Sequence, residues 1–434
     1  MKVYEKVYGY FVEQIAKGAL KPGDRMPSIR STEKFLGVSR TTVETAYLQM
    51  AADGYIYSVE KVGYFISNMT ERNTILDQNY KEKRPVESKN RKEPEHVFKY
   101  DLATIGEDRS VSCLDLWRRY MKSALRQEER LLSYAQNQGE DDLRLEISHF
   151  VRKHRNIICS PEDIVIGAGF QNLLQILIPL ISGERTISFP TRDFMDGAVS
   201  FQSAGFQVNF RDKESHVIYV TPAYMTKWGE VMTMKRRREL VEHVTKNNHL
   251  LIEDDYQNEF VYSSKPTPSL YALTGGENVA YLGSFSRLLL PSVRISYLIL
   301  PRNAREDYHS IRDLYNQTAS KAEQIALAQF LRDGHLIRHI KKIKRLYEEK
   351  RNIMQKALID NFSGDSEIYV GDSGMEMGLL IKGQNIIDRL KDSDVSVNVL
   401  WSRDNETFLL LSCSRIESEN IATSITKLNE SLHQ

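Results

Sequence analysis

Five short apolar segments, separated by helical segments, constrain the fold of residues 98–434 more than any other feature of the sequence. They are 164–166, 217–220, 249–253, 279–282 and 295–300. Strands that are apolar on both faces occur mainly in parallel sheets that helices cover on both sides. We therefore expect an α/β fold with a mostly parallel sheet, then a long helical stretch at about 304–357 and a final α+β region.

Residues 1–68 have the pattern of a separate small domain. A first helix is indicated by apolar residues at helical spacing: Val3, Val7, Phe11 and Ile15. A second helical pattern follows Pro27, and Ser39 is expected to cap a third helix over residues 40–53. Residues 55–67 are predicted to form a β-hairpin. Three helices followed by a hairpin is the order of a winged helix-turn-helix.

Residues 69–97 are mostly polar and charged, with two prolines and few apolar residues. This composition is typical of a solvated linker between residues 1–68 and 98–434. A polar surface helix is the alternative interpretation.

The overall composition limits the kinds of partner. Lys and Arg number 59 against 58 Asp and Glu, so the net charge is +1 and any DNA-binding surface must be local. The cysteines, Cys113, Cys159 and Cys413, have no metal-ligand spacing, and we expect no metal site. Their odd number favours a reducing cytoplasm. The N-terminus lacks the pattern of a signal peptide, and no apolar stretch is long enough to span a bilayer, so no membrane partner is expected.

Residues 20–30 (LKPGDRMPSIR) and 36–47 (LGVSRTTVETAY) resemble the GntR-type winged helix in both residue type and spacing. In such domains the N-terminal end of the recognition helix contacts base edges and phosphates. The resemblance implies that operator DNA is the partner and that the contacts come from Arg30, Ser39, Arg40, Thr41, Thr42 and Gly63, the last at the tip of the wing. The alternative makes Arg30 and Arg40 ordinary solvated surface charges.

Three further segments, 167–169 (GAG), 253–256 (EDDY) and 283–287 (GSFSR), occur in the second region. Together they resemble the effector domain of MocR-type (GabR-like) regulators, in which a GntR-type winged helix is fused to a fold-type I, pyridoxal-phosphate (PLP)-dependent aminotransferase-like domain. The resemblance implies a large α/β domain, a small C-terminal α+β domain and a homodimer.

The resemblance also implies a ligand pocket. The phosphate would contact the backbone of Gly167, Ala168 and Gly169, at the start of a helix, together with Ser284, Ser286 and Arg294. Phe194 would stack on the pyridine ring, Asp254 would pair with the ring nitrogen, and Tyr256 would bind the ring hydroxyl.

Arg287 occupies the position of the family's cofactor lysine. A lysine amine can form a Schiff base, whereas a guanidinium stays protonated and is a poor nucleophile. Three roles are open: pairing with Asp254 in an empty pocket, holding a phosphate- or carboxylate-bearing ligand, or lining noncovalently bound PLP. Lys227 or Lys265 would be a substitute amine only if its surface position were wrong.

Two other departures concern substrate recognition. The loop at 221–229 lacks the histidine and glutamine of the family pattern, and Leu410 occupies the position of the arginine that clamps a substrate carboxylate. Arg415 lies nearby in sequence and is a weak candidate for that role.

The sequence therefore predicts a cytoplasmic, sequence-specific transcriptional regulator with no catalytic residues and no covalently bound cofactor. Its effector domain would dimerise and would sense a small-molecule ligand if one exists. The alternatives are a PLP-dependent enzyme with an accessory DNA-binding domain and a purely structural dimerisation domain.

Overall fold

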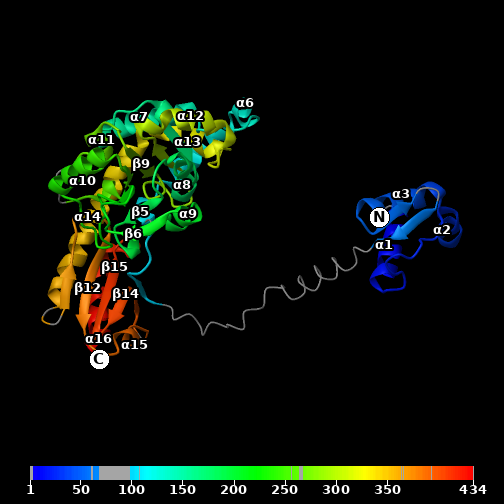
Figure 1. Cartoon of the computed structure of the whole chain (residues 1–434). Coiled ribbons are helices and arrows are strands. Elements are labelled where there is room, and N and C mark those ends of the chain that lie inside the picture. The colour runs from blue at the N-terminus through cyan, green and yellow to red at the C-terminus, as the bar shows by residue number, and fades with distance from the viewer. Residues whose placement is uncertain are drawn as a thin grey trace. The chain divides into compact units, whose positions relative to one another are not determined.

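The computed structural model describes residues 3–59, 62–67, 98–106, 108–255, 257–262, 267–362, 364, 366–391 and 393–433. The chain divides into two compact units, Met1–His96 and Val97–Gln434 (Figure 1). The predicted linker at 69–97 lies outside the described residues, as do Tyr256 and Lys265.

The first unit is a winged helix. Its elements, in chain order, are α1 (Val3–Ala16), α2 (Ile29–Leu36), α3 (Arg40–Ala52), β1 (Ile56–Val59) and β2 (Gly63–Ile66). The two strands pair as an antiparallel hairpin. The predicted apolar stripe of α1 is confirmed at Val7, Phe11 and Ile15, which are buried with Val43 and Tyr47 of α3.

Local signals set the ends of the two helices that form the helix-turn-helix. Ser28 caps α2, since its hydroxyl accepts a hydrogen bond from the Ser31 N–H at 3.2 Å. Gly37 ends α2 with a φ of +63°, a conformation that glycine adopts at little cost. The Ser39 hydroxyl then accepts from the Thr42 N–H at 3.3 Å, which confirms Ser39 as the N-cap of α3.

The larger layer of the second unit is built on a seven-stranded sheet. In spatial order its strands are β4 (Ile164–Gly167), β10 (Ser296–Ile299), β9 (Val279–Ser284), β8 (Leu250–Asp254), β7 (Val217–Val220), β5 (Thr186–Phe189) and β6 (Gln207–Phe210). Strand β10 is antiparallel to both neighbours, and the other pairs are parallel. The five apolar segments predicted as strands are all present, within a mostly parallel sheet.

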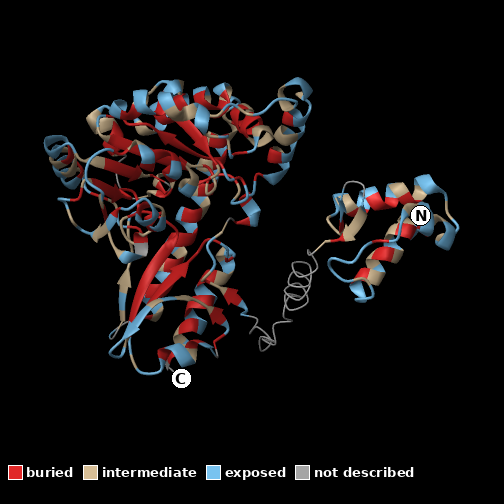
Figure 2. Cartoon of the chain, turned by 45° about the vertical axis from the view of Figure 1, so that its right-hand side comes forward, coloured by how far each residue is buried: buried red, intermediate tan, exposed pale blue. Residues whose placement is uncertain are grey.

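Successive residues of these strands belong to two separate cores. Leu251 lies in one apolar cluster and Ile252 in the other, and Ile218 and Tyr219 divide in the same way. Side chains alternate across a strand, so both faces of the sheet are covered. Figure 2 shows the sheet as buried beneath more exposed helices. The helices of this layer are α5 (Leu114–Leu125), α6 (Glu128–Leu131), α7 (Asp141–Arg155), α8 (Phe170–Leu177), α9 (Ala198–Ser203), α10 (Met234–Asn247), α11 (Leu270–Thr274), α12 (Arg305–Ile311) and α13 (Lys321–Arg332).

The smaller layer is α+β, as expected, and lies beside the larger one (Figure 1). Its elements are α14 (His335–Asn361), the antiparallel strands β11 (Ser366–Tyr369), β12 (Glu376–Lys382), β14 (Asn398–Arg403) and β15 (Glu406–Ser412), and the helices α15 (Ile386–Lys391) and α16 (Ser418–His433). The N-terminal segment of the unit joins this layer, because β3 (Tyr100–Asp101) pairs with β13 (Val395–Ser396).

One expectation about the helices is wrong. The predicted long helix at about 304–357 is three helices, α12, α13 and α14. The last break falls at Gly334, whose φ of +70° reverses the backbone between α13 and α14.

None of the helices that the structure describes is long and apolar enough to cross a lipid bilayer.

Candidate functional site

The amino end of α3 presents the residues predicted to contact DNA. Arg40 and Thr41 are exposed in its first turn, and the Ser39 hydroxyl lies 2.8 Å from the Thr42 hydroxyl. Arg40 Nε donates to Glu44 Oε1 at 2.8 Å, and this hydrogen bond raises the pKa of Arg40. The guanidinium is therefore held along the helix, charged and open to solvent. Arg30 is exposed in the first turn of α2.

The wing has a feature that the sequence did not reveal. Gly63 has a φ of +131°, and a Cβ atom added to it would lie 3.5 Å from Nε and Nη2 of Arg25. The Arg25 guanidinium also donates a hydrogen bond to the Val62 carbonyl. Arg25 therefore fixes the wing and places a cation beside it. It lies within the motif at 20–30, but nothing in that motif separates it from a surface arginine.

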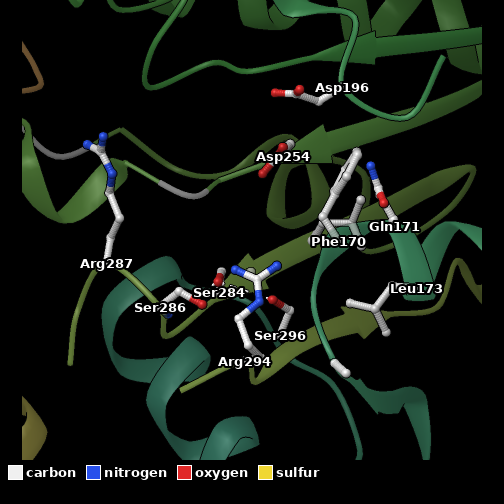
Figure 3. A pocket seen from close by; sticks show the side chains of 13 residues that line it. Phe170, Gln171, Leu173, Asp196, Asp254, Ser284, Ser286, Arg287, Arg294 and Ser296 are labelled. Carbon is white, nitrogen blue, oxygen red and sulfur yellow. Dashed lines mark hydrogen bonds between the residues drawn. The ribbon is translucent and has the colours of Figure 1, made fainter. Parts of the chain in front are cut away.

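The second unit has a cavity of about 450 Å³ where β8 and β9 end and α8 begins (Figure 3). The residues predicted for the ligand pocket that line it are Ala168, Asp254, Ser284, Ser286, Arg287 and Arg294. Residues far apart in the sequence are thus brought together.

The lower part of the cavity in Figure 3 is suited to an anion. Gly169 caps α8 with a φ of +106°, and a Cβ atom added there would lie 2.7 Å from Arg294 Nη2. The guanidinium therefore packs directly on the loop that begins the helix. The first N–H groups of a helix lack intrahelical acceptors, and the helix dipole also favours an anion there. The Ala168 N–H, however, already donates to the Thr318 hydroxyl at 3.1 Å.

The serines of the site shape the turn between β9 and β10. The Ser286 hydroxyl donates to the Val293 carbonyl at 3.0 Å, and the Ser286 N–H donates to the Ser284 hydroxyl at 3.3 Å. Ser296 donates to the same Ser284 hydroxyl at 3.1 Å. These bonds hold the two ends of the turn that carries Arg287 and Arg294.

Asp254 faces the cavity from the end of β8 (Figure 3). Its carboxylate accepts a hydrogen bond from the Tyr219 hydroxyl at 2.6 Å. Tyr219 is buried and packs edge-on against Phe170, at 6.0 Å between ring centroids. The neighbouring acids, Glu253 and Asp255, are buried away from the cavity because side chains alternate at the end of a strand.

Those two acids have structural partners. Glu253 accepts hydrogen bonds from the N–H groups of Leu270 and Tyr271, both at 2.9 Å. Burial, with repulsion from Asp255, raises the pKa of Glu253 to about 7. Asp255 accepts from Arg155 Nε at 2.5 Å and from the Tyr281 hydroxyl at 2.6 Å.

Arg287 is paired, but not with Asp254. Its Nη2 lies 3.7 Å from Oε1 of Glu376, which begins β12 in the smaller layer and is fully buried. The other oxygen of Glu376 accepts from the Tyr224 hydroxyl at 3.1 Å and from the Met375 N–H at 3.0 Å. The interpretation that Arg287 pairs with Asp254 is therefore wrong, because a carboxylate from another layer takes that role.

Two other predicted residues lie behind the cavity wall. Phe194 is buried at 6.0 Å from the Tyr224 ring, and Lys227 Nζ lies 4.3 Å from its centroid. The aromatic residue that lines the cavity is Phe170, so the expected position of Phe194 is corrected. Gly167 also lies behind the loop, where an added Cβ atom would be 2.5 Å from Asn172 Oδ1.

A second cavity, of about 230 Å³, adjoins the first. The two share Ser286, Arg287 and Arg294. The remaining wall of the second cavity is mostly apolar: Ile105, Gly106, Leu289, Pro291, Ile343, Tyr347 and Met375.

The candidate substrate clamps lie outside both cavities. Leu410 is buried in β15. Arg415 is not among the residues that line either cavity; it covers Gly106, where an added Cβ atom would lie 2.9 Å from Arg415 Cδ.

A winged helix joined to an aminotransferase-like domain with an anion-binding pocket defines a DNA-binding protein with an effector domain. Residues 3–66 match the family model "Bacterial regulatory proteins, gntR family", and residues 210–384 match "Aminotransferase class I and II". The HTH-type transcriptional regulator YdeL of Bacillus subtilis is 31% identical, over 86% of this chain and 83% of its own. The chain therefore belongs to the MocR-type regulators of the GntR family.

Other similarities agree with this assignment. The pyridoxine biosynthesis regulator PdxR of Corynebacterium glutamicum is 29% identical, over 80% of this chain and 76% of its own. The probable rhizopine catabolism regulatory protein MocR of Rhizobium meliloti is 25% identical, over 86% and 81%.

Solved structures support the fold of the second unit. An archaeal alanine:glyoxylate aminotransferase has a TM-score of 0.67 at 20% identity and covers 83% of this chain and 95% of its own. The α-aminoadipate aminotransferase LysN of Thermus thermophilus, complexed with N-(5'-phosphopyridoxyl)-L-leucine, has a TM-score of 0.65 at 19% identity over 77% and 92%.

Proposed function

We propose that this transcriptional regulator contacts operator DNA through α3 and the wing, and that its effector domain binds a phosphate-bearing ligand without a covalent bond. The observation that carries the second part is the packing of Arg294 on Gly169 at the amino end of α8. A charged guanidinium beside unpaired helical N–H groups is a site for a phosphate.

Part of the pocket fits PLP. Arg294 and the start of α8 suit its phosphate, and Asp254 suits a protonated ring nitrogen. Such a pairing is what allows the cofactor ring to act as an electron sink when it is bound. The covalent anchor does not fit, because Arg287 occupies the position where the family resemblance places lysine. A ligand of the PLP type would therefore bind as a noncovalent effector, an idea that the name of the relative PdxR, a regulator of pyridoxine biosynthesis, supports.

A homodimer is part of the proposal. The segment around α6, at the rim of the larger layer in Figure 1, exposes Leu125, Leu132 and Tyr134. Leu132 is 89% exposed and Tyr134 is fully exposed, an unusual cost unless a partner covers them. Sedimentation of the full chain tests this association.

The second candidate function is enzymatic, with Lys227 as a substitute amine. Lys227 Nζ lies over the Phe194 ring, and Phe194 is behind the cavity wall. This position favours the noncovalent proposal. Lysine trapping discriminates between the two: after incubation with PLP and borohydride, the enzymatic alternative requires a phosphopyridoxyl group on one stoichiometric lysine.

The test of the regulator proposal uses purified full-length protein and the DNA upstream of its own gene. We expect sequence-dependent, salt-sensitive binding, and we expect pyridoxine 5′-phosphate to stabilise the protein against thermal unfolding. Binding that is equally tight to unrelated DNA would contradict the first part. The absence of stabilisation by any phosphate monoester would contradict the second.

A further inference from the structure

Arg287 and Arg294 lie on the wall between the two cavities. Both residues, with Ser286, line both spaces, and the rest of the smaller cavity is mostly apolar. A ligand that fills only the larger cavity leaves the smaller one without an occupant. The shared wall therefore suggests a ligand with two parts.

The two arginines differ in their surroundings. Arg294 packs against the start of α8, which suits a phosphate. Arg287 faces the carboxylate of Glu376 at 3.7 Å, which is longer than a hydrogen bond of 2.7–3.2 Å. Its side chain is 23% exposed. A planar guanidinium has five donors, so it can hold a second carboxylate while it stays near Glu376.

The smaller cavity shows what the second part of such a ligand carries. Ile105, Leu289 and Met375 present apolar surface there, and Tyr347 adds an aromatic ring. This wall favours a hydrocarbon substituent next to the carboxylate. A carboxylate beside an apolar side chain is the arrangement found in a hydrophobic amino acid.

We propose that the effector is a phosphate monoester joined to a hydrophobic amino acid. Its phosphate binds at Arg294, its carboxylate binds Arg287, and its apolar side chain fills the smaller cavity. Such a conjugate already contains its own carbon–nitrogen bond, so it requires no lysine from the protein. Arg287 then supplies the carboxylate recognition that Leu410 cannot. This inference rests on the proposed phosphate site and makes it specific.

The experiment compares three probes by calorimetry with wild-type, full-length protein. N-(5'-phosphopyridoxyl)-L-leucine carries all three groups. N-(5′-phosphopyridoxyl)-3-methylbutylamine lacks only the carboxylate, and pyridoxine 5′-phosphate lacks both the carboxylate and the side chain. We expect the leucine conjugate to bind at least about tenfold more tightly than either of the others, as a charged hydrogen-bond pair allows.

Two variants assign the carboxylate contact. Arg287→Gln should abolish the preference for the leucine conjugate over the methylbutylamine conjugate. Arg415→Gln should retain it, since Arg415 covers Gly106 outside both cavities. The wild-type comparison alone is decisive even if Arg287→Gln fails to fold.

The outcomes separate the two levels of the proposal. If all three probes bind with equal affinity, the amino-acid conjugate is ruled out and the phosphate site stands. If none of them binds, the proposed phosphate site fails as well. A preference that survives Arg287→Gln and disappears in Arg415→Gln would overturn the role of Arg287.

Discussion

The guanidinium of Arg287 faces the fully buried carboxylate of Glu376, with 3.7 Å between Nη2 and Oε1. Arg287 follows β9 in the larger layer and Glu376 begins β12 in the smaller one. The pair therefore joins two layers across the wall of the candidate ligand site. A buried carboxylate that loses its cation is strongly destabilising, so this pair also contributes to the stability of the unit.

The first prediction concerns that pair. Arg287→Met leaves the Glu376 charge buried without its cation and should lower the free energy of unfolding by about 3 kcal/mol. Adding Glu376→Gln to the same chain removes the charge and should recover much of the loss, because neutral replacements of buried pairs are often tolerated. Denaturant unfolding of the full chain measures both. Additive effects of the two substitutions would contradict a direct interaction.

The second prediction restores the amine. Arg287→Lys places a primary amine at the edge of a cavity that keeps Asp254 and Arg294. We expect this variant to form a borohydride-stable adduct with PLP on the introduced side chain, whereas the wild-type protein should form none at a single stoichiometric position. Peptide mass spectrometry after reduction locates the adduct. A wild-type adduct on Lys227 would favour the enzymatic alternative.

The third prediction tests the phosphate cradle. Gly169→Ala adds a Cβ atom 2.7 Å from Arg294 Nη2, at a φ of +106°. The guanidinium must shift, and the backbone conformation costs about 1 kcal/mol. We expect the affinity for pyridoxine 5′-phosphate to fall at least about tenfold. Gly205→Ala is the matched control, since it also has a positive φ but nothing lies within 4 Å of its added Cβ.

The order of elements and much of the candidate site were predictable because they depend on local patterns. Asp254 ends an apolar strand, and residues at the ends of neighbouring parallel strands meet at one edge of the sheet. Such a pattern brings 254 close to 284 without any knowledge of the fold. The capping of α3 by Ser39 is equally local.

Other parts of the site depend on packing between distant elements. Glu376 is an acidic residue at the start of an apolar strand, which indicates a buried partner but does not say which one. Phe194 was assigned from a loop that is longer than the family pattern, and Phe170 of α8 lines the cavity instead. The break at Gly334 was missed because helical periodicity continues on both sides of it.

The fourth prediction concerns DNA. Arg40 is exposed at the amino end of α3 and is aligned by Glu44. Arg40→Ala should weaken operator binding roughly ten- to a hundredfold and reduce its dependence on salt. Lys17→Ala is the control, because Lys17 lies on α1 and pairs there with Glu13. Fluorescence anisotropy at several salt concentrations measures both effects. An Arg40 variant with the wild-type salt dependence would exclude a phosphate contact.

The last prediction is a pH dependence of stability that comes from Glu253. Burial, then repulsion from Asp255, raises the pKa of this carboxyl from 4.5 to about 7, against the opposing effects of the Leu270 and Tyr271 N–H groups and of Arg237. Between these two values the folded protein holds a proton that the unfolded chain has released. The stability that Glu253 contributes therefore falls as the pH rises from about 4.5 to about 7, and it stays low above that range. Glu253→Gln cannot ionise, so it escapes this loss, although its amide can accept only one of the two backbone hydrogen bonds.

The variant should thus melt below the wild type at about pH 5, and the difference should shrink or reverse at about pH 8. Thermal unfolding of both proteins at the two pH values gives the comparison, and the other carboxyl groups cancel because both chains contain them. Glu239→Gln, on the exposed surface of α10, should show no such change with pH. A difference between Glu253→Gln and wild type that is constant with pH would mean that Glu253 ionises at the same pH in the folded and unfolded chains. In that case the two backbone hydrogen bonds and Arg237 would offset its burial completely.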